Sequence, residues 1–195
     1  MAAVGGGALL ATSWVIVATT DHVSELEARA FAAVNRLPGA AWPVVWVPMQ
    51  LGSLLGSLAA VGVTWRVSRD RRLTLSALIA SQTGYWAAKG VKRIVSRERP
   101  GALLPDVIAR EHATGLGYLS GHSAVAFALA TALAPSLPRA ARPAVYGAAA
   151  TVAFGRIYGS AHLPLDVVGG IGLGLLVGTF SRWALGLGGV GLPPR

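Results

Sequence analysis

Long apolar runs alternate with short polar segments along this chain, and six of the runs approach the length of a membrane span. They are Ala2–Thr20, Trp42–Trp65, Leu73–Ile94, Gly121–Leu137, Pro143–Tyr158 and Leu163–Leu187. A helix needs about 20 mostly apolar residues to cross the hydrocarbon core of a bilayer. The pattern therefore predicts an all-α integral membrane bundle of six transmembrane helices, in which the fourth and fifth are short.

The first run could instead be a signal peptide, but it lacks a basic start, and no small-residue cleavage site stands out before Asp21. We therefore interpret it as a retained helix. In the next segment, Asp21–Pro38, apolar residues recur at helical spacing against charged ones. The apolar positions are Val23, Leu26, Ala30, Val34 and Leu37, and the charged positions are Glu25, Glu27, Arg29 and Arg36. This pattern predicts a helix that lies in the membrane interface.

Glycines at four-residue intervals indicate close packing between helices, because they let neighbouring backbones approach. They are Gly52 and Gly56, followed by Gly170, Gly174 and Gly178. No soluble second domain, linker or repeat is visible. We expect residues 1–195 to form a single transmembrane domain, in which residues 89–170 carry the motifs described below.

The composition agrees with a membrane protein: 53% of the residues are hydrophobic, 13% are charged, and the mean hydropathy is +0.56. The net charge of +9 could suggest nucleic acid, but the basic residues lie in short clusters without interleaved aromatic residues. Anionic lipid headgroups or a phosphate substrate fit better as partners. The absence of cysteine excludes disulfides and thiolate catalysis. The abundance of alanine, glycine, valine and arginine is typical of a GC-rich bacterial genome. Nothing in the sequence indicates an oligomeric state.

Positive charge in the short loops gives the expected orientation. Eight cations fall on the side of the loop Arg66–Arg72 and nine on the other side, so the count alone does not decide. That loop is the densest cluster, and three of the nine opposing cations belong to the candidate site. We therefore expect both termini in the cytoplasm of a bacterium and the site on the outer face of the plasma membrane.

Three segments hold most of the unusual polar residues: Lys92–Pro100, Leu119–His122 and Arg156–Asp166. In a six-helix arrangement they lie at the end of the third helix, at the start of the fourth, and across the turn between the fifth and sixth. All three then emerge on the same membrane face. Charges scattered at random would have no reason to share one side, so this convergence predicts a functional site.

The residue types in these segments fit phosphoryl transfer, which needs cations, N–H donors, a nucleophile and a proton donor. Lys92, Arg99 and Arg156 can neutralise the phosphate, and Ser120 with the Gly121 amide begins a helix, where anions bind favourably. His162 precedes Asp166 by four residues, so the carboxylate can orient the imidazole for attack. His122 can protonate the leaving oxygen.

Each residue also has an ordinary structural explanation. Basic residues at helix ends are usually interfacial anchors, Ser120 could be a plain N-cap, and His162 with Asp166 could be a local pair. We expect His22 and His112 to be solvated. The histidines lack recurrent metal-ligand spacing, so we expect neither a metal ion nor another cofactor. Two alternatives remain: a membrane protein that binds or moves a lipid phosphate without catalysis, and, more distantly, a soluble nucleic-acid binder.

Together the three segments resemble the motifs of the type-2 phosphatidic acid phosphatase family, which is related to vanadium haloperoxidases. The first motif of the family consists of a lysine, six further residues and then Arg-Pro, and the segment from Lys92 through Arg99-Pro100 is similar to it. The second motif, Pro-Ser-Gly-His, is similar to Leu119–His122. The third motif consists of Ser-Arg, five residues, a histidine, three residues and an aspartate, and the segment from Gly155 through Asp166 is similar to it. Leu119 and Gly155 depart from the family's proline and serine, and neither position carries the central chemistry.

The resemblance implies a metal-independent lipid phosphatase. Its phosphate-binding residues would be Lys92, Arg99, Ser120, Gly121 and Arg156; His122 would be the acid, His162 the nucleophile that forms a phosphohistidine, and Asp166 its orienting partner. The headgroup stays open among undecaprenyl diphosphate, phosphatidylglycerol phosphate, phosphatidic acid and other polyprenyl phosphates. We expect the loop Gly101–Leu119 and the segment Asp21–Pro38 to influence that choice.

Overall fold

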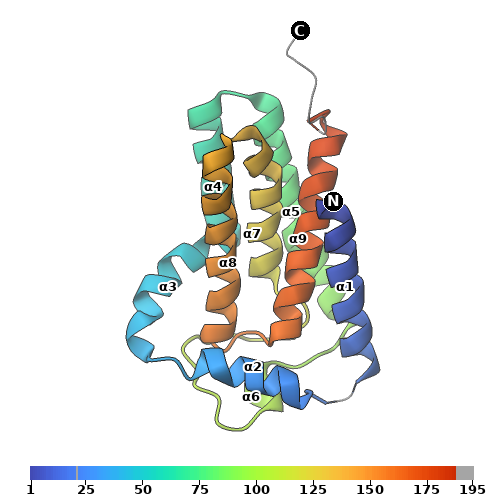
Figure 1. Ribbon diagram of the computed structural model, residues 1–195, viewed down its shortest axis with the longest axis vertical. Coiled ribbons are helices and arrows are strands. Elements are labelled where there is room, and N and C mark those ends of the chain that lie inside the picture. The colour runs from blue at the N-terminus through green and yellow to red at the C-terminus, as the bar shows by residue number, and fades with distance from the viewer. Residues whose placement is uncertain (21, 188–195) are drawn as a thin grey trace.

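The computed structural model describes residues 1–20 and 22–187, and this part of the chain is helical without a strand (Figure 1). Arg195, which entered the cation count above, lies outside the described residues. The α-helices are α1 (Ala2–Thr19), α2 (Glu25–Asn35), α3 (Trp42–Met49), α4 (Leu54–Ser68), α5 (Arg71–Ile94), α6 (Pro100–Leu103), α7 (Gly121–Leu133), α8 (Arg142–Tyr158) and α9 (Pro164–Ala184). The all-α prediction is confirmed, and helices occupy all six predicted apolar segments.

Helix α7 lies inside the bundle and packs against α5, α8 and α9, while α1 packs along the outer side of α9 (Figure 1). The glycines of α9 make this close packing possible. A Cβ atom added at Gly170, Gly174 or Gly178 would lie 2.5–2.6 Å from a backbone oxygen of Ser120, Ala124 or Ala128, respectively. The packing role predicted for these glycines is therefore confirmed.

The second predicted span is broken. Helices α3 and α4 meet at an angle of 70°, with a short 3₁₀ turn, Gln50–Gly52, between them. The hydroxyl of Ser53 accepts a hydrogen bond from the Gly56 amide at 3.0 Å and so begins α4 anew. A Cβ at Gly52 would lie 2.6 Å from the His122 carbonyl oxygen. The break thus places the 3₁₀ turn directly on the start of α7.

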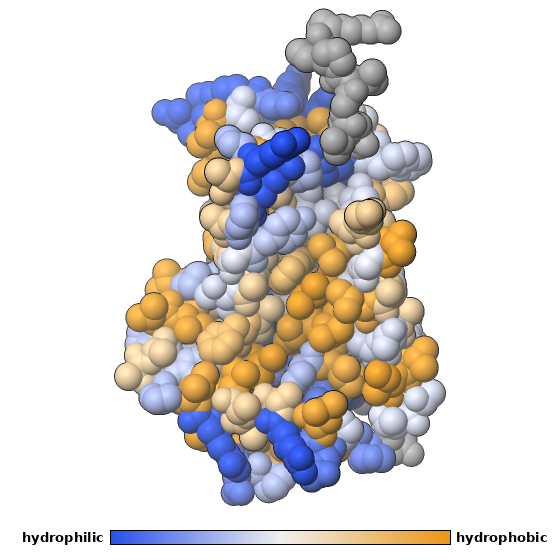
Figure 2. Space-filling view, in the orientation of Figure 1, coloured by the Kyte–Doolittle hydropathy of each residue, from blue (hydrophilic) through white to orange (hydrophobic). Residues whose placement is uncertain are grey.

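Two helices, Ala2–Thr19 and Pro164–Ala184, are each long and apolar enough to cross a membrane. If the bent pair α3–α4 counts as one span, the described chain has up to three. Helix α7 has 13 residues and α8 has 17. At about 1.5 Å per residue, neither reaches the roughly 30 Å of a hydrocarbon core unaided. On the face that Figure 2 shows, hydrophobic residues gather over the middle of the molecule and hydrophilic ones at its two ends. The protein is thus a membrane protein, and the count of six spans stays a prediction.

Helix α2 forms where predicted and lies across the lower ends of α8 and α9 (Figure 1). Its orientation differs from the sequence pattern, because Glu27, Phe31 and Asn35 are buried while Leu26 is 80% exposed. The grouping of Glu27 with the exposed charged residues was wrong. The reason is that this surface of the bundle offers polar partners: Glu27 pairs with Arg97, and the Asn35 amide donates to the carbonyls of Ile108 and Tyr158.

Candidate active site

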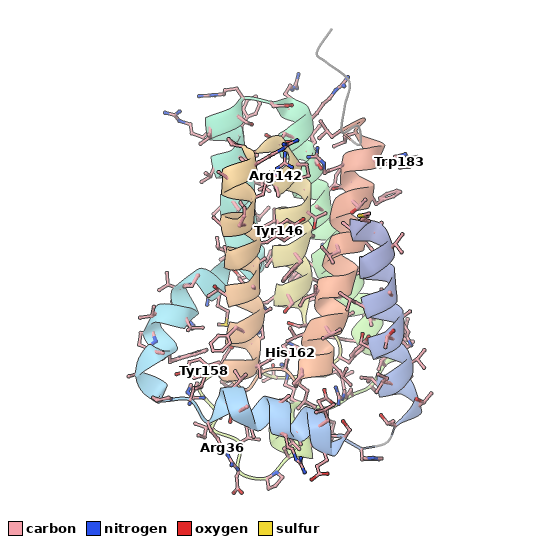
Figure 3. All side chains as sticks on the ribbon, viewed as in Figure 1. Arg36, Arg142, Tyr146, Tyr158, His162 and Trp183 are labelled. Carbon is pink, nitrogen blue, oxygen red and sulfur yellow. The ribbon has the colours of Figure 1, made fainter. Side chains whose placement is uncertain are left out.

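The three polar segments meet at one end of the helix bundle, as predicted. Ser120 N donates to the Asp166 carbonyl at 2.9 Å, and the Arg99 guanidinium donates to the Ala161 carbonyl. Figure 3 shows His162 at this end, beside the start of α9, and Arg142 near the opposite end. The residues between α5 and α7 therefore close over the turn between α8 and α9.

The three candidate phosphate-binding cations all bond to oxygen atoms of the loop 111–117. Lys92 Nζ donates to the carbonyls of Leu116 and Gly117 at 2.8 and 2.7 Å. Arg99 donates to the carbonyls of Thr114 and Gly115 as well as Ala161. Arg156 Nη1 donates to both carboxylate oxygens of Glu111 at 2.9 and 2.7 Å. The loop thus presents to these cations the kind of oxygen acceptors that a bound phosphate would present.

The start of α7 supplies the predicted helix N-terminus. Ser120 is fully buried, and its hydroxyl accepts hydrogen bonds from the amide and the hydroxyl of Ser123 at 3.4 and 3.0 Å. Ser120 therefore serves as the N-cap. Gly121 is half-buried, and a Cβ there would meet Ala88 at an ordinary 3.7 Å, so close packing does not require glycine at this position.

His162 and Asp166 are both buried, with exposures of 2% and 0%. Their atoms Nδ1 and Oδ2 are 3.5 Å apart, which is close enough for an ionic contact and longer than an ordinary hydrogen bond. Oδ2 instead accepts the Leu163 amide at 2.9 Å, and Nδ1 finds no hydrogen-bond partner among the described residues. The carboxylate therefore lies beside the imidazole, as predicted, but it forms its hydrogen bonds with other groups.

Burial lowers the pKa of His162 well below its ordinary value of 6.5, and the positive charges of Lys92, Arg156 and Arg99 lower it further, while a backbone contact with Gly117 acts in the opposite direction. The imidazole is therefore neutral at physiological pH, which is the form that can act as a nucleophile. Burial also lowers the pKa of Arg99, and the neighbouring Arg156 adds to this effect.

His122 lies in the first turn of α7 and is half-buried. The charges of Arg156, Arg99 and Lys92 are near enough to act on its imidazole, and the His162 ring is also within range. The structure therefore brings both site histidines and all three cations into one cluster. His22 and His112 are exposed, in agreement with their expected solvation.

The comparisons with known proteins agree with this geometry. A protein-family model described as the PAP2 superfamily matches residues 51–186. The chain belongs to the PAP2 superfamily. This confirms the resemblance stated on the motifs, and it makes the protein a phosphatase, and therefore a hydrolase.

Two solved structures share the PAP2 fold of this chain. LpxE of Aquifex aeolicus is 21% identical, with a TM-score of 0.78, over 85% of this chain and 99% of that one. The transmembrane PAP2-type phosphatidylglycerolphosphate phosphatase of Bacillus subtilis is also 21% identical, with a TM-score of 0.75, over 92% and 94% of the two chains. No curated protein sequence matches the chain. At this identity the two structures support the fold alone.

The two departures from the PAP2 motifs fit into the packing. Leu119 is fully buried in an apolar cluster with Tyr118 and Ala88. A Cβ at Gly155 would lie 3.0 Å from Val45 Cγ1 and 3.2 Å from Met49 Sδ. Helix α3 thus occupies the space beside Gly155, and a serine there would have to displace it by a few tenths of an ångström.

Three charged residues of the site escaped the sequence reasoning. Glu111 pairs with Arg156, and Arg97 joins Glu27 to Asp166. Arg97 lies inside the first motif segment, and Glu27 shares a helical face with Phe31 and Asn35 at four-residue spacing, so both carried a weak signal. Glu111 lies in an irregular loop, and no sequence pattern distinguishes it from a solvated residue.

Proposed function

We propose that this PAP2 phosphatase hydrolyses a lipid phosphate or polyprenyl diphosphate in the bacterial plasma membrane through a phosphohistidine formed on His162. The observation that carries the proposal is the buried neutral imidazole of His162 within a cluster of three cations, at one end of a membrane bundle. The open substrate choices include undecaprenyl diphosphate, phosphatidylglycerol phosphate and phosphatidic acid. Because the Bacillus subtilis structure is that of a phosphatidylglycerolphosphate phosphatase, phosphatidylglycerol phosphate is the first substrate to test.

In the first step, the His162 nitrogen that faces away from Asp166 attacks phosphorus. The P–N bond forms as the bond between phosphorus and the leaving oxygen breaks, and His122 gives that oxygen a proton. The products are the lipid alcohol, or the lipid monophosphate from a diphosphate, and the phosphohistidine. The Asp166 carboxylate favours the positive charge that develops on the ring.

In the second step, water attacks the phosphohistidine and His122 takes a proton from it. The P–N bond breaks, inorganic phosphate leaves, and His162 becomes neutral again. Lys92, Arg99 and Arg156 exchange their loop oxygens for phosphate oxygens and stabilise the charge that spreads over the transferring group. Two of the three are arginines, whose planar guanidinium groups suit bidentate contact with phosphate.

These side-chain cations supply the charge neutralisation that a metal ion provides in many other phosphoryl-transfer enzymes. Within the described residues, no three histidine or carboxylate side chains approach closely enough to hold a metal ion. Because the three cations can take this role, we propose a metal-independent reaction. We place the site on the outer membrane face, because the arginine-rich turn between α4 and α5 lies at the opposite end of the bundle (Figure 1).

The decisive experiment is phosphate release from a panel of these lipids by purified protein in the presence of a chelator. We expect turnover by the wild type and none by His162→Ala, together with a phosphohistidine that labelled substrate produces only in the wild type. A His162→Ala variant with near wild-type turnover would remove the covalent mechanism. Lipid binding without any phosphate release by the wild type would favour the non-catalytic alternative.

A further inference from the structure

We propose that Glu27 of α2 is a positioning residue for the reaction: through Arg97 it holds the Asp166 carboxylate beside His162. This inference rests on the proposed function, because it assigns a role in the same reaction. It concerns a helix that precedes the motif-bearing part of the chain and that supplies none of the motif residues.

Arg97 bonds to two carboxylates at once. Its Nη1 donates to Glu27 Oε1 at 3.1 Å and to Asp166 Oδ1 at 2.9 Å, and its Nη2 donates to Glu27 Oε2 at 2.6 Å. The side chains of Arg97, Glu27 and Asp166 are only 11%, 4% and 0% exposed. Charge-assisted hydrogen bonds between buried groups are strong and directional, so the guanidinium fixes the relative position of α2 and α9.

The bonds of Asp166 leave its carboxylate little freedom. Oδ1 is held by Arg97, and Oδ2 accepts the Leu163 amide while lying 3.5 Å from His162 Nδ1. Without the bond from Arg97, the carboxylate could rotate about its remaining backbone contact. The distance between Oδ2 and Nδ1, and with it the support for positive charge on the ring, therefore depends on Arg97.

Glu27 holds Arg97 in this place and also holds the start of α9. Its Oε1 accepts the Leu165 amide at 2.9 Å, next to Asp166 in the chain. Burial by itself would lower the pKa of Arg97, but the bonds and charges of Glu27 and Asp166 outweigh it and raise this pKa. The cation therefore stays charged while it joins the two carboxylates, and Glu27 is the member that α2 contributes.

A purely structural ion pair would give a different result from a positioning residue. Breaking such a pair would lower the stability of the fold, or the fraction of correctly folded protein, without a specific effect on the rate of the chemical step. A positioning residue acts on kcat at nearly unchanged KM, because the phosphate-binding cations are not altered. In metal sites, removing a group that orients a metal ligand typically lowers activity by about 10- to 100-fold, and we expect a loss of this order here.

The test is steady-state kinetics on the lipid that the wild type hydrolyses, with the monodisperse detergent-solubilised protein. For Glu27→Gln we expect kcat to fall about 10- to 100-fold with KM within about twofold of wild type. Glu27→Asp keeps the charge and should recover part of the loss. Glu25→Gln is the matched control, since Glu25 lies on the same helix in an exposed ion pair with Arg29 and should leave both constants unchanged.

An unchanged kcat in folded Glu27→Gln would overturn the proposal, as would a loss carried by KM alone. If Glu27→Gln does not fold, Arg97→Lys provides the second measurement, because it keeps the charge and loses the fork that joins the two carboxylates. A wild-type kcat in Arg97→Lys would equally refute the positioning role. If the wild type itself releases no phosphate, the proposed function is wrong, and so is this inference, which rests on it.

Discussion

Replacing Glu111 by glutamine should lower the stability of the protein without ligand and raise its affinity for phosphate analogues. Arg156 donates to both oxygens of the Glu111 carboxylate, so a substrate must displace this contact before it can bind to the arginine. Arg156 is almost completely buried, whereas the Glu111 side chain is 24% exposed. Glutamine keeps the size of the side chain and removes the competing charge.

The magnitude follows from the exposure of the pair. A hydrogen bond to a charged partner contributes about 1.5–3 kcal/mol. Because water reaches Glu111 and the glutamine oxygen can still accept one bond, we expect a gain of about 1 kcal/mol in ligand binding, which is about fivefold in affinity. Arg156 meanwhile loses its counter-charge, so the free protein should lose about 1–2 kcal/mol of stability, less than the cost in a fully buried pair.

The assay combines vanadate inhibition with thermal unfolding in detergent. Vanadate can adopt the five-coordinate shape of the transferring phosphoryl group and should bind in the same place. Glu111→Gln should show a lower inhibition constant, a lower Tm without vanadate, and a larger rise in Tm with vanadate than the wild type. Glu98→Gln, an exposed neighbour that removes the same charge, is the control. Equal or weaker vanadate inhibition in Glu111→Gln would refute the reasoning.

Three further predictions concern stability and orientation. Because the pKa of His162 in the folded protein lies well below its ordinary 6.5, the unfolded state takes up the proton first as pH falls, and this lowers the free energy of unfolding. Between pH 7.5 and 5.5, Tm should therefore fall less in His162→Gln than in wild type. Gly174→Ala places a Cβ 2.6 Å from the Ala124 carbonyl and should lower Tm by the equivalent of about 1–3 kcal/mol, whereas Gly62→Ala, with nothing within 4 Å, should not; equal Tm values in the two variants would contradict the packing argument. In intact cells, a membrane-impermeant thiol reagent should label His112→Cys and spare Ala140→Cys, both exposed positions in a cysteine-free chain, and the reverse pattern would move the site to the cytoplasmic leaflet.

The hydrophobic pattern of the sequence located the helices of all six apolar segments and the existence of α2, because burial in lipid or in a tight helix bundle demands apolar residues at helical spacing. The motif residues predicted convergence on one membrane face, and the structure brings Lys92, Arg99, Arg156 and both site histidines together at one end of the bundle. These features depend on local spacing, which a single sequence displays directly.

The tertiary structure alone decided where the remaining charges go. Hydropathy marks Glu27 as a surface residue, yet it is buried, because Arg97 and the Leu165 amide, both distant in sequence, satisfy its carboxylate. The same holds for the pairing of Glu111 with Arg156 and for the 70° break between α3 and α4, at which Gly52 packs against the start of α7. A polar residue can be buried wherever the fold supplies a partner, and the partner is a property of the packed chain, not of the residue's neighbours in sequence.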